Sequence, residues 1–222
     1  MIEIREIVTK IMLTHRTRTS KEFIKTILSF IVRKSGSSSL TKRRLKRRYL
    51  QRGRPLKLHL GCGSLHLDDY INIDIQDWAN ACDLVANATV LHMFEDNSID
   101  HIFTHALLEH IPPWNTMKTL REWYRILKCG GTIQIEVPDL ERIFQDWLVN
   151  KTLGEQTAID NIYGGNKAPN KVYSRQDHLA GFTYDRLTRM MRECGFINCK
   201  RLEHAKYHCI LVIFAQKMNH QL

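Results

Sequence analysis

The chain has 222 residues, 43% of them hydrophobic, which suits one globular domain with an appendage. The formal net charge of +10 is unevenly divided: residues 1–54 hold 16 Lys and Arg against 3 Asp and Glu, whereas residues 55–222 hold 17 against 20. The basic charge therefore belongs to an N-terminal extension, residues 1–54, that precedes a predicted domain at 55–217. This balance argues against a nucleic-acid-binding surface on the domain itself.

The extension combines an apolar stretch with a basic cluster. Apolar residues in 23–32 recur at helical spacing, but the stretch is too short for a membrane span, which needs about 20 residues. A Ser-rich break at 35–39 separates it from Lys-Arg-Arg-Leu-Lys-Arg-Arg at 42–48. Three interpretations stay open: a helix packed on the domain with a solvated linker, an anionic membrane surface bound through residues 21–54, and, less favoured, nucleic acid phosphates.

We expect a cytoplasmic protein, which in the membrane-binding case lies peripheral to the inner face of the membrane. Residues 1–10 alternate charged and apolar side chains and lack the apolar core of a signal peptide. The six cysteines form no Cys-x-x-Cys pair, and several lie in apolar runs, which is typical of a reducing compartment.

The predicted domain alternates strands with helices, which is typical of an α/β protein with a parallel sheet. Strands are predicted at 57–60, 71–75, 83–86, 100–104, 132–137, 197–202 and 209–216. Helices are predicted at 114–128, 140–150 and 183–194, the last between a Thr183 N-cap and a stop at Gly195. Polar residues 203–207 predict an antiparallel hairpin that closes the sheet.

The central feature is the turn after the first predicted strand. Residues 58–64 read Leu-His-Leu-Gly-Cys-Gly-Ser, and the next strand, Tyr-Ile-Asn-Ile-Asp-Ile at 70–75, ends near a carboxylate. Glycine takes positive φ readily and lets the backbone approach a ligand closely. In an open α/β sheet such a turn lies at the carboxyl ends of the strands, where ligands bind. Asp74 is thereby placed to accept hydrogen bonds from two ribose hydroxyls.

Further stretches follow in a fixed order: Phe-Glu-Asp-Asn-Ser-Ile-Asp at 94–100, His-Ala-Leu-Leu-Glu-His at 105–110, Leu-Lys-Cys-Gly-Gly at 127–131 and Val-Pro-Asp-Leu-Glu at 137–141. With the turn at 59–63 and the strand at 71–74, this set resembles class I S-adenosylmethionine (SAM)-dependent methyltransferases, in particular the small ones associated with sugar-polymer biosynthesis. The resemblance covers nearly all of residues 55–217. It implies a Rossmann-like, seven-stranded α/β sheet, mostly parallel with a C-terminal antiparallel strand, and SAM as cofactor.

The resemblance also implies a set of cofactor contacts. Gly61, Cys62 and Gly63 would bring the first turn close to the methionine and ribose parts of SAM, and Asp74 would hold the ribose hydroxyls. A strand-ending turn residue at Asp74 is the less favoured alternative.

Two further cofactor positions have alternatives that stay open. Asn87 stands where the family commonly places an Asp that accepts from the adenine amino group, but it equally suits a local turn. His105 would line the methionine end of SAM, and Glu109 and His110, which begin the next loop, are within reach of cofactor or substrate. Both His105 and His110 equally suit partly buried structural histidines.

The chain departs from the family pattern at several points. His59 stands where an acidic residue is common, and Cys129 where proline is usual. Only residues 64–70 join the first two strands, whereas a parallel crossover usually needs a dozen or more residues. We therefore expect the usual first helix to be shortened to a turn or replaced in space by the N-terminal helix. The Gly130–Gly131 pair is expected to form a structural turn.

The substrate side is predicted in residues 151–182, which lack regular periodicity. A long segment of this kind in a compact domain is usually functional or disordered. In the resembled family this region caps the site, and a Gly-Gly followed by a His recurs there. We therefore expect Gly164, Gly165 and His110 near the substrate, and we nominate His178 as a possible general base. A His178 that only fixes the loop is the slightly favoured alternative.

The sequence predicts no metal site. The pairs His101/His105 and His204/His208 are each four residues apart, but neither pair has a convincing third and fourth ligand for zinc.

The expected function is SAM-dependent methylation of an oxygen of a saccharide, nucleotide-sugar or lipid-linked intermediate, the substrate class following from the resemblance alone. Two alternatives stay open: a non-catalytic regulatory module that keeps the fold, and an RNA methyltransferase that holds its substrate with the basic extension.

Overall fold

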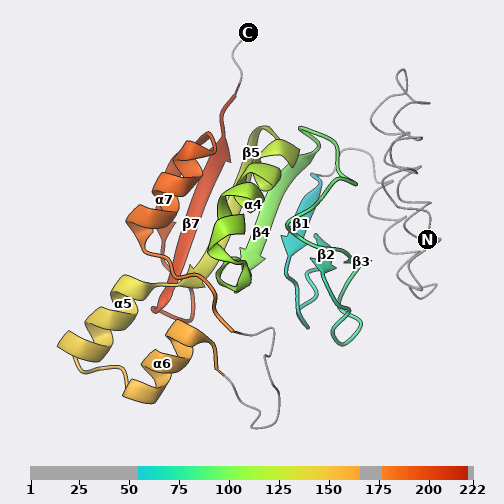
Figure 1. Cartoon of the computed structure of the whole chain (residues 1–222). Coiled ribbons are helices and arrows are strands. Elements are labelled where there is room, and N and C mark those ends of the chain that lie inside the picture. The colour runs from blue at the N-terminus through green and yellow to red at the C-terminus, as the bar shows by residue number, and fades with distance from the viewer. Residues whose placement is uncertain (1–54, 166–176, 220–222) are drawn as a thin grey trace, which may run out of the picture.

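A computed structural model describes residues 55–165 and 177–219, which form a seven-stranded sheet of order β3-β2-β1-β4-β5-β7-β6 (Figure 1). The strands are β1 (Lys57–Leu60), β2 (Ile71–Asp74), β3 (Leu84–Val85), β4 (Ile99–His105), β5 (Leu127–Pro138), β6 (Phe196–Leu202) and β7 (Ile210–Lys217). Strands β1 to β5 are parallel to one another, and β7 runs antiparallel to both β5 and β6. The predicted Rossmann-like α/β sheet with its C-terminal hairpin is thus confirmed.

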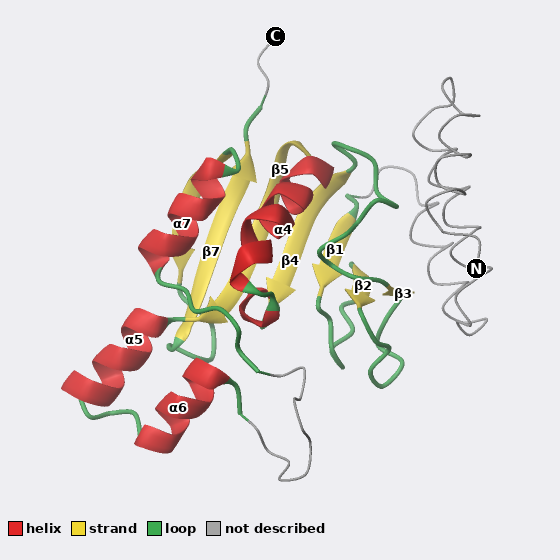
Figure 2. Cartoon of the chain, in the orientation of Figure 1, coloured by secondary structure: helices red, strands yellow, loops and turns green. Residues whose placement is uncertain are grey.

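The helices are α4 (Pro113–Ile126), α5 (Leu140–Phe144), α6 (Glu155–Tyr163) and α7 (Tyr184–Glu193), with a 3-10 turn η1 (Leu108–His110) and a π-helical turn η2 (Gln145–Val149) that continues α5. Helices α4 and α7 lie on the same face of the sheet, and α5 and α6 lie beyond the end of the sheet where β5 finishes and β7 begins (Figure 2). All three predicted helices are present. The helix α6 and the turn η1 were not predicted.

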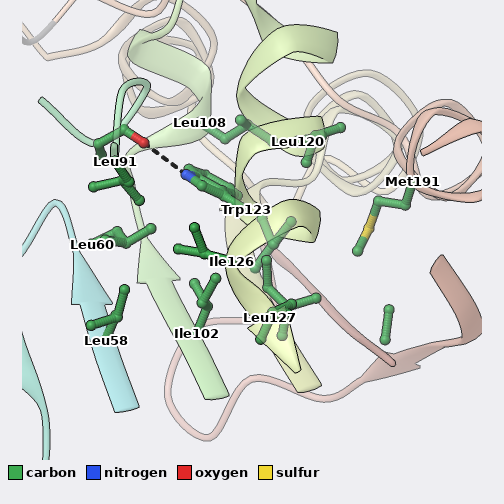
Figure 3. Close-up of a cluster of buried hydrophobic side chains, with 14 of the residues drawn as sticks. Leu58, Leu60, Leu91, Ile102, Leu108, Leu120, Trp123, Ile126, Leu127 and Met191 are labelled. Carbon is green, nitrogen blue, oxygen red and sulfur yellow. Dashed lines mark hydrogen bonds between the residues drawn. The ribbon is translucent and has the colours of Figure 1, made fainter. Parts of the chain in front are cut away.

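Helix α4 anchors the core on its face of the sheet. Pro113 begins the helix, where a missing N–H costs nothing. Leu120, Trp123 and Ile126 are fully buried against apolar side chains of β1 and β4 (Figure 3). The Trp123 indole donates a 2.8 Å hydrogen bond to the Ala88 carbonyl, which ties the connection after β3 to the helix.

The junction of α4 and β5 differs from the prediction. The helix ends at Ile126 instead of 128, because Leu127 already pairs with Ile99 in the sheet. The next pair in the register is His101 with Thr132, so residues 128–131 form a bulge within β5. Gly130 has a φ of +75° there, which makes the predicted structural turn part of the strand.

Three successive parallel connections on the β3 side of the sheet are made without helices. Within the described residues, 61–70, 75–83 and 86–98 contain only turns and extended segments. The predicted shortening of the first helix to a turn is therefore confirmed. The N-terminal extension, its predicted helix and its basic cluster lie outside the described residues, so the division at 54/55 stays a prediction.

One buried asparagine ties two of these connections together. The Asn72 amide nitrogen donates to the Leu67 and Tyr70 carbonyls at 3.0 and 3.2 Å, and to the Asp83 carboxylate at 2.8 Å. Its oxygen accepts from the Leu67 amide at 2.9 Å and lies 3.0 Å from Nδ1 of His59. Asn72, Asp83 and His59 are all buried. A polar network thus replaces the helix that normally spans this crossover.

His59 is a member of this network. Because the Asn72 oxygen can only accept, Nδ1 of His59 carries the proton. Burial lowers the pKa of His59, which keeps the imidazole neutral. His59, which stands where the resembled family commonly has an acidic residue, therefore has a structural role in this chain.

No helix among the described residues is long and apolar enough to cross a membrane.

We expect Asn72→Ala to destabilise the domain by roughly 3 kcal/mol, because it leaves several buried donors and acceptors without partners. The measurement is the midpoint of urea unfolding followed by circular dichroism. Asn87→Ala is the control, since this exposed asparagine makes only local hydrogen bonds to Thr89. Equal midpoints for the two variants would contradict the structural role of Asn72.

Candidate functional site

The predicted site residues gather at the carboxyl edge of the parallel strands. The glycine turn follows β1, Asp74 ends β2, Asn87 follows β3, and His105 ends β4. Such an edge is where ligands bind in open α/β sheets.

The glycine turn is fixed to β2 by main-chain hydrogen bonds. The amides of Gly61 and Cys62 both donate to the Ile73 carbonyl, at 2.8 and 3.1 Å, and the Gly63 amide donates to Oδ2 of Asp74 at 2.9 Å. The two glycines have φ values of +70° and +53°, which favour residues without a side chain.

The two glycines differ in what surrounds them. A Cβ at Gly61 would lie 2.9 Å from the Leu107 side chain, so this glycine lets Leu107 pack on the turn. A Cβ at Gly63 would meet nothing within 4 Å, so the chain leaves open space there. The Asp74 carboxylate accepts hydrogen bonds from the Gly63 amide at 2.9 Å and from the Gln76 amide at 3.3 Å. Its other lone pairs are left to accept from a ligand. A partly buried carboxylate beside an open glycine turn fits the ribose of a nucleoside cofactor.

Only the main chain of Cys62 is available for contact with a ligand, because its thiol is buried. Its thiol is buried and lies 3.4 Å from the Cys82 sulfur. The contact with Cys82 and burial raise the pKa of the Cys62 thiol, so it stays protonated. A cofactor contact by Cys62 would therefore come from its backbone.

Asn87 forms a local turn, which was one of the two roles that the sequence allowed beside an adenine contact. Its amide oxygen accepts from both the amide and the hydroxyl of Thr89, at 2.9 Å each. The side chain is exposed, and its amide nitrogen is the group left to face a ligand. An adenine contact by Asn87 stays a prediction.

His105 pairs with a buried carboxylate from the neighbouring strand. Its Nδ1 lies 2.7 Å from Oε2 of Glu136, and this hydrogen bond raises the pKa of His105 against the opposing effect of burial. Burial acts to raise the pKa of Glu136, but hydrogen bonds from His105 and Gln134 outweigh it and lower the pKa. The pair is therefore an ion pair at the end of β4 whenever His105 is protonated.

Glu109 has a buried carboxyl group whose hydrogen bonds are not satisfied by other side chains of the described residues. It lies in η1, is 1% exposed, and neither side-chain oxygen has a hydrogen-bond partner among residues 55–165 and 177–219. Burial raises the pKa of Glu109 to about 7. The sequence placed Glu109 in this loop but gave it no definite role. Its position directly before His110, after a strand end, was the only signal.

The loop that carries His178 lies directly on η1. The amides of Leu179 and Ala180 both donate to the main-chain carbonyl of Glu109, at 2.7 and 3.0 Å. This clamp brings the rings of His110 and His178 to a centroid distance of 4.9 Å. The two residues were predicted separately on the substrate side, and their roles there stay predictions.

Both histidines use Nδ1 to bind a main-chain carbonyl. Nδ1 of His110 lies 3.1 Å from the Asp177 carbonyl, and Nδ1 of His178 lies 3.0 Å from the Asn161 carbonyl. A carbonyl only accepts, so each Nδ1 carries a proton and each neutral ring keeps a lone pair on Nε2. Burial lowers the pKa of both histidines. One donor atom each of Glu109, His110 and His178 lies within 4.8 Å of the others, and we call these residues the three-donor cluster.

Gly164 and Gly165 follow helix α6, next to the loop that bears His178. Gly164 has a φ of +87°, and its amide donates to the Asp160 carbonyl to end the helix. The His178 amide donates to the Tyr163 carbonyl at 2.9 Å, which places the glycine pair close to the three-donor cluster. Contact of these glycines with a substrate stays a prediction.

The evenly spaced histidine pairs do not act together. His101 binds the Thr132 hydroxyl at 2.8 Å, whereas His105 binds Glu136. His204 lies 3.6 Å from Glu136, whereas His208 lies 3.1 Å from Asp146. Each pair is thus divided between different partners.

Comparisons with known proteins agree with the fold. Residues 58–135 match a family model described as a methyltransferase domain. Solved structures of similar fold include SAM-dependent methyltransferases from Methanosarcina mazei (22% identity, TM-score 0.53, covering 79% of this chain and 98% of that one) and Archaeoglobus fulgidus (18%, 0.51, 82% and 95%). A putative SAM-dependent methyltransferase from Listeria monocytogenes is similar at 14% identity and a TM-score of 0.53, covering 81% and 98%. No curated protein matches the chain.

We expect Glu136→Gln to lower the pKa of His105 to its ordinary value of 6.5 or below, because burial then dominates. The measurement is a nuclear magnetic resonance titration of the histidine ring signals. Because the folded pKa of His105 lies above its unfolded value, the pair stabilises the domain fully below pH 6.5 and loses this effect as the pH rises through the folded pKa. Glu203→Gln, at an exposed carboxylate, is the control, and an unchanged His105 titration in Glu136→Gln would contradict the pairing.

Proposed function

We propose that this chain, a SAM-dependent methyltransferase of the class I fold, methylates an oxygen atom of a saccharide or of a saccharide-containing polymer intermediate. The observation that carries the proposal is the junction of two groups at one edge of the sheet. Leu107 packs on Gly61 of the glycine turn, and Glu109 follows two residues later. The turn that suits a nucleoside and the three-donor cluster are therefore adjacent.

The cofactor side consists of the glycine turn and the strand ends beside it. Asp74 accepts the ribose hydroxyls with the lone pairs that Gly63 leaves free, and the backbone of residues 61–63 faces the ligand. Asn87 lies at the adenine end, where its amide nitrogen donates, and His105 lies at the methionine end. When bound, SAM supplies a methyl group on a sulfonium, which an oxygen lone pair attacks in line while the breaking C–S bond leaves its electrons on sulfur.

The acceptor side consists of the three-donor cluster and the glycines beside it. A saccharide hydroxyl is a weak acid and gains from a base that accepts its proton as the new bond forms. The unprotonated Nε2 of His178 is suited to take that proton, because Nδ1 is already held by the Asn161 carbonyl. His110, Gly164 and Gly165 lie around the same position and orient the acceptor. The remaining contribution of the protein is alignment of the two reactants.

The saccharide class is supported by the family resemblance and by the chemistry of the cluster. Imidazole and carboxylate groups are hydrogen-bond acceptors for hydroxyls, and saccharides present several hydroxyls together. The basic extension supports an acceptor held at an anionic membrane surface, such as a lipid-linked saccharide.

Calorimetric titration with SAM and with S-adenosylhomocysteine tests the cofactor site. We expect binding to the parent and at least about tenfold weaker binding to Asp74→Ala, since charged hydrogen bonds to the ribose are lost. Asp185→Ala, at an exposed carboxylate of α7, is the matched control. Undiminished affinity in a folded Asp74→Ala variant would contradict the proposed ribose contact.

The proposed base is tested by His178→Ala, once an acceptor is found by screening saccharides with radiolabelled SAM. Turnover should fall about 100-fold or more, which is the usual contribution of a positioned base, while SAM affinity stays near that of the parent. His208→Ala, at an exposed histidine, should leave turnover unchanged. Unchanged turnover in His178→Ala would remove this residue from the reaction.

A further inference from the structure

We propose that Glu109, His110 and His178 bind a divalent ion of the first transition series. The sequence predicted no metal, because the evenly spaced histidine pairs lack further ligands. The three donors of this cluster come instead from two distant segments, 109–110 and 178, which only the fold brings together.

The buried carboxyl group of Glu109 calls for a bound partner. An unpaired carboxylate in the interior is costly, and such a group in a native structure calls for a bound ion or water as its partner. Three nearby main-chain amides are used elsewhere, because those of Leu179 and Ala180 bind its backbone carbonyl and that of His110 binds the Leu107 carbonyl. A cation would neutralise the charge and satisfy the side-chain oxygens together.

The imidazoles of His110 and His178 are held in the way that metal-binding histidines are usually held. Histidines that bind metals usually donate their other ring N–H to a carbonyl or a carboxylate, which fixes the ring and its tautomer. His110 and His178 both do so, to the carbonyls of Asp177 and Asn161. Each ring therefore presents the Nε2 lone pair as its free ligand atom.

The donor atoms of the three side chains are close enough for these side chains to converge on one ion. Nitrogen and oxygen ligands lie about 2.0–2.2 Å from zinc, so neighbouring ligands are separated by about 3.5 Å. The three donor atoms lie within 4.8 Å of one another, and the main-chain clamp between Glu109 and residues 179–180 holds their backbones in place. Two imidazoles and one carboxylate leave coordination positions open, as in catalytic zinc and non-haem iron sites.

Two other clusters in the described part of the chain lack these features. In His105–Glu136–His204, both Glu136 oxygens already accept hydrogen bonds, from His105 and Gln134. In Asp146–His208–Cys209, the His208 side chain is exposed, and Asp146 already accepts from Asn150. Among these clusters, only Glu109 is left with both carboxylate oxygens unpaired. The other clusters therefore supply matched controls.

The role of the ion in catalysis rests on the proposed function, whereas its binding does not. Through its open positions the ion would bind an acceptor with two neighbouring hydroxyls and lower the pKa of one of them. That hydroxyl loses its proton to solvent, and its oxygen then forms the O–CH₃ bond as the S–CH₃ bond breaks and the electron pair stays on sulfur. In the metal-free protein Nε2 of His178 is the proposed base, whereas in the metal-bound protein the same atom is a ligand and the proton passes to water.

The test is a titration of the full chain, purified without a histidine tag and stripped of metal by a chelator, with Co²⁺ followed by its visible absorption. We expect about one equivalent to bind the parent and His208→Ala, with at least about tenfold weaker binding to Glu109→Gln and His178→Ala. No saturable binding by the folded parent, or equal binding by the parent and a folded Glu109→Gln, would overturn the site.

A second measurement needs no variant. Paramagnetic Co²⁺ should broaden the ring signals of His110 and His178 in the parent before those of His204 and His208. Broadening of His204 or His208 first would also overturn the site.

Turnover separates the failure of this site from the failure of the proposed function. If the ion acts in the reaction, metal-free protein should bind SAM but transfer methyl at least about tenfold more slowly until Co²⁺ or Mn²⁺ is restored. Full turnover without metal would overturn the catalytic role of the ion and leave His178 as the base. Loss of SAM binding itself would count against the proposed function and not against the ion.

Discussion

The polar network around Asn72 is the constraint on which the cofactor side of the molecule depends. Parallel strands β1 and β2 are joined by a connection too short for the usual helix, and Asn72 holds this connection at Leu67 and Tyr70. The same side chain reaches Asp83 before β3 and His59 in β1. With the strands fixed in this way, Ile73 binds the glycine turn and Asp74 meets Gly63. A buried amide therefore positions these strands across a connection that contains no helix.

The three-donor cluster is held by a different set of contacts. The backbone of Glu109 is clamped by residues 179–180, and two main-chain carbonyls fix the rings of His110 and His178. These contacts orient the cluster through backbone groups, which leaves the functional atoms of its side chains free. Leu107, packed on Gly61, joins this cluster to the glycine turn. The same arrangement leaves the buried carboxyl group of Glu109 without a hydrogen-bond partner among the described residues, which destabilises the fold.

Much of the fold follows from local patterns. The parallel sheet, the C-terminal hairpin and helix α7 were predicted because alternation, caps and the glycine turn are local signals. The bulge at 128–131 was missed because pairing of Leu127 with Ile99 is a contact between distant residues, which periodicity does not reveal. Likewise His59 looked like a departure from a functional pattern, and only its contact with Asn72 explains it. The nomination of His178 came from the resemblance, whereas its contact with His110 was not predicted. The unpaired state of Glu109 could not be predicted, because it depends on which distant amides bind elsewhere.

The most direct test of the account is a crystal structure of the full chain grown with S-adenosylhomocysteine and Mn²⁺, with the ion located by anomalous scattering. The account predicts ribose hydroxyls on Asp74 and a manganese peak bounded by Glu109, His110 and His178. A bound nucleoside away from Asp74, or an ion coordinated only by other residues, would contradict the claim that one edge of the sheet holds both reactants.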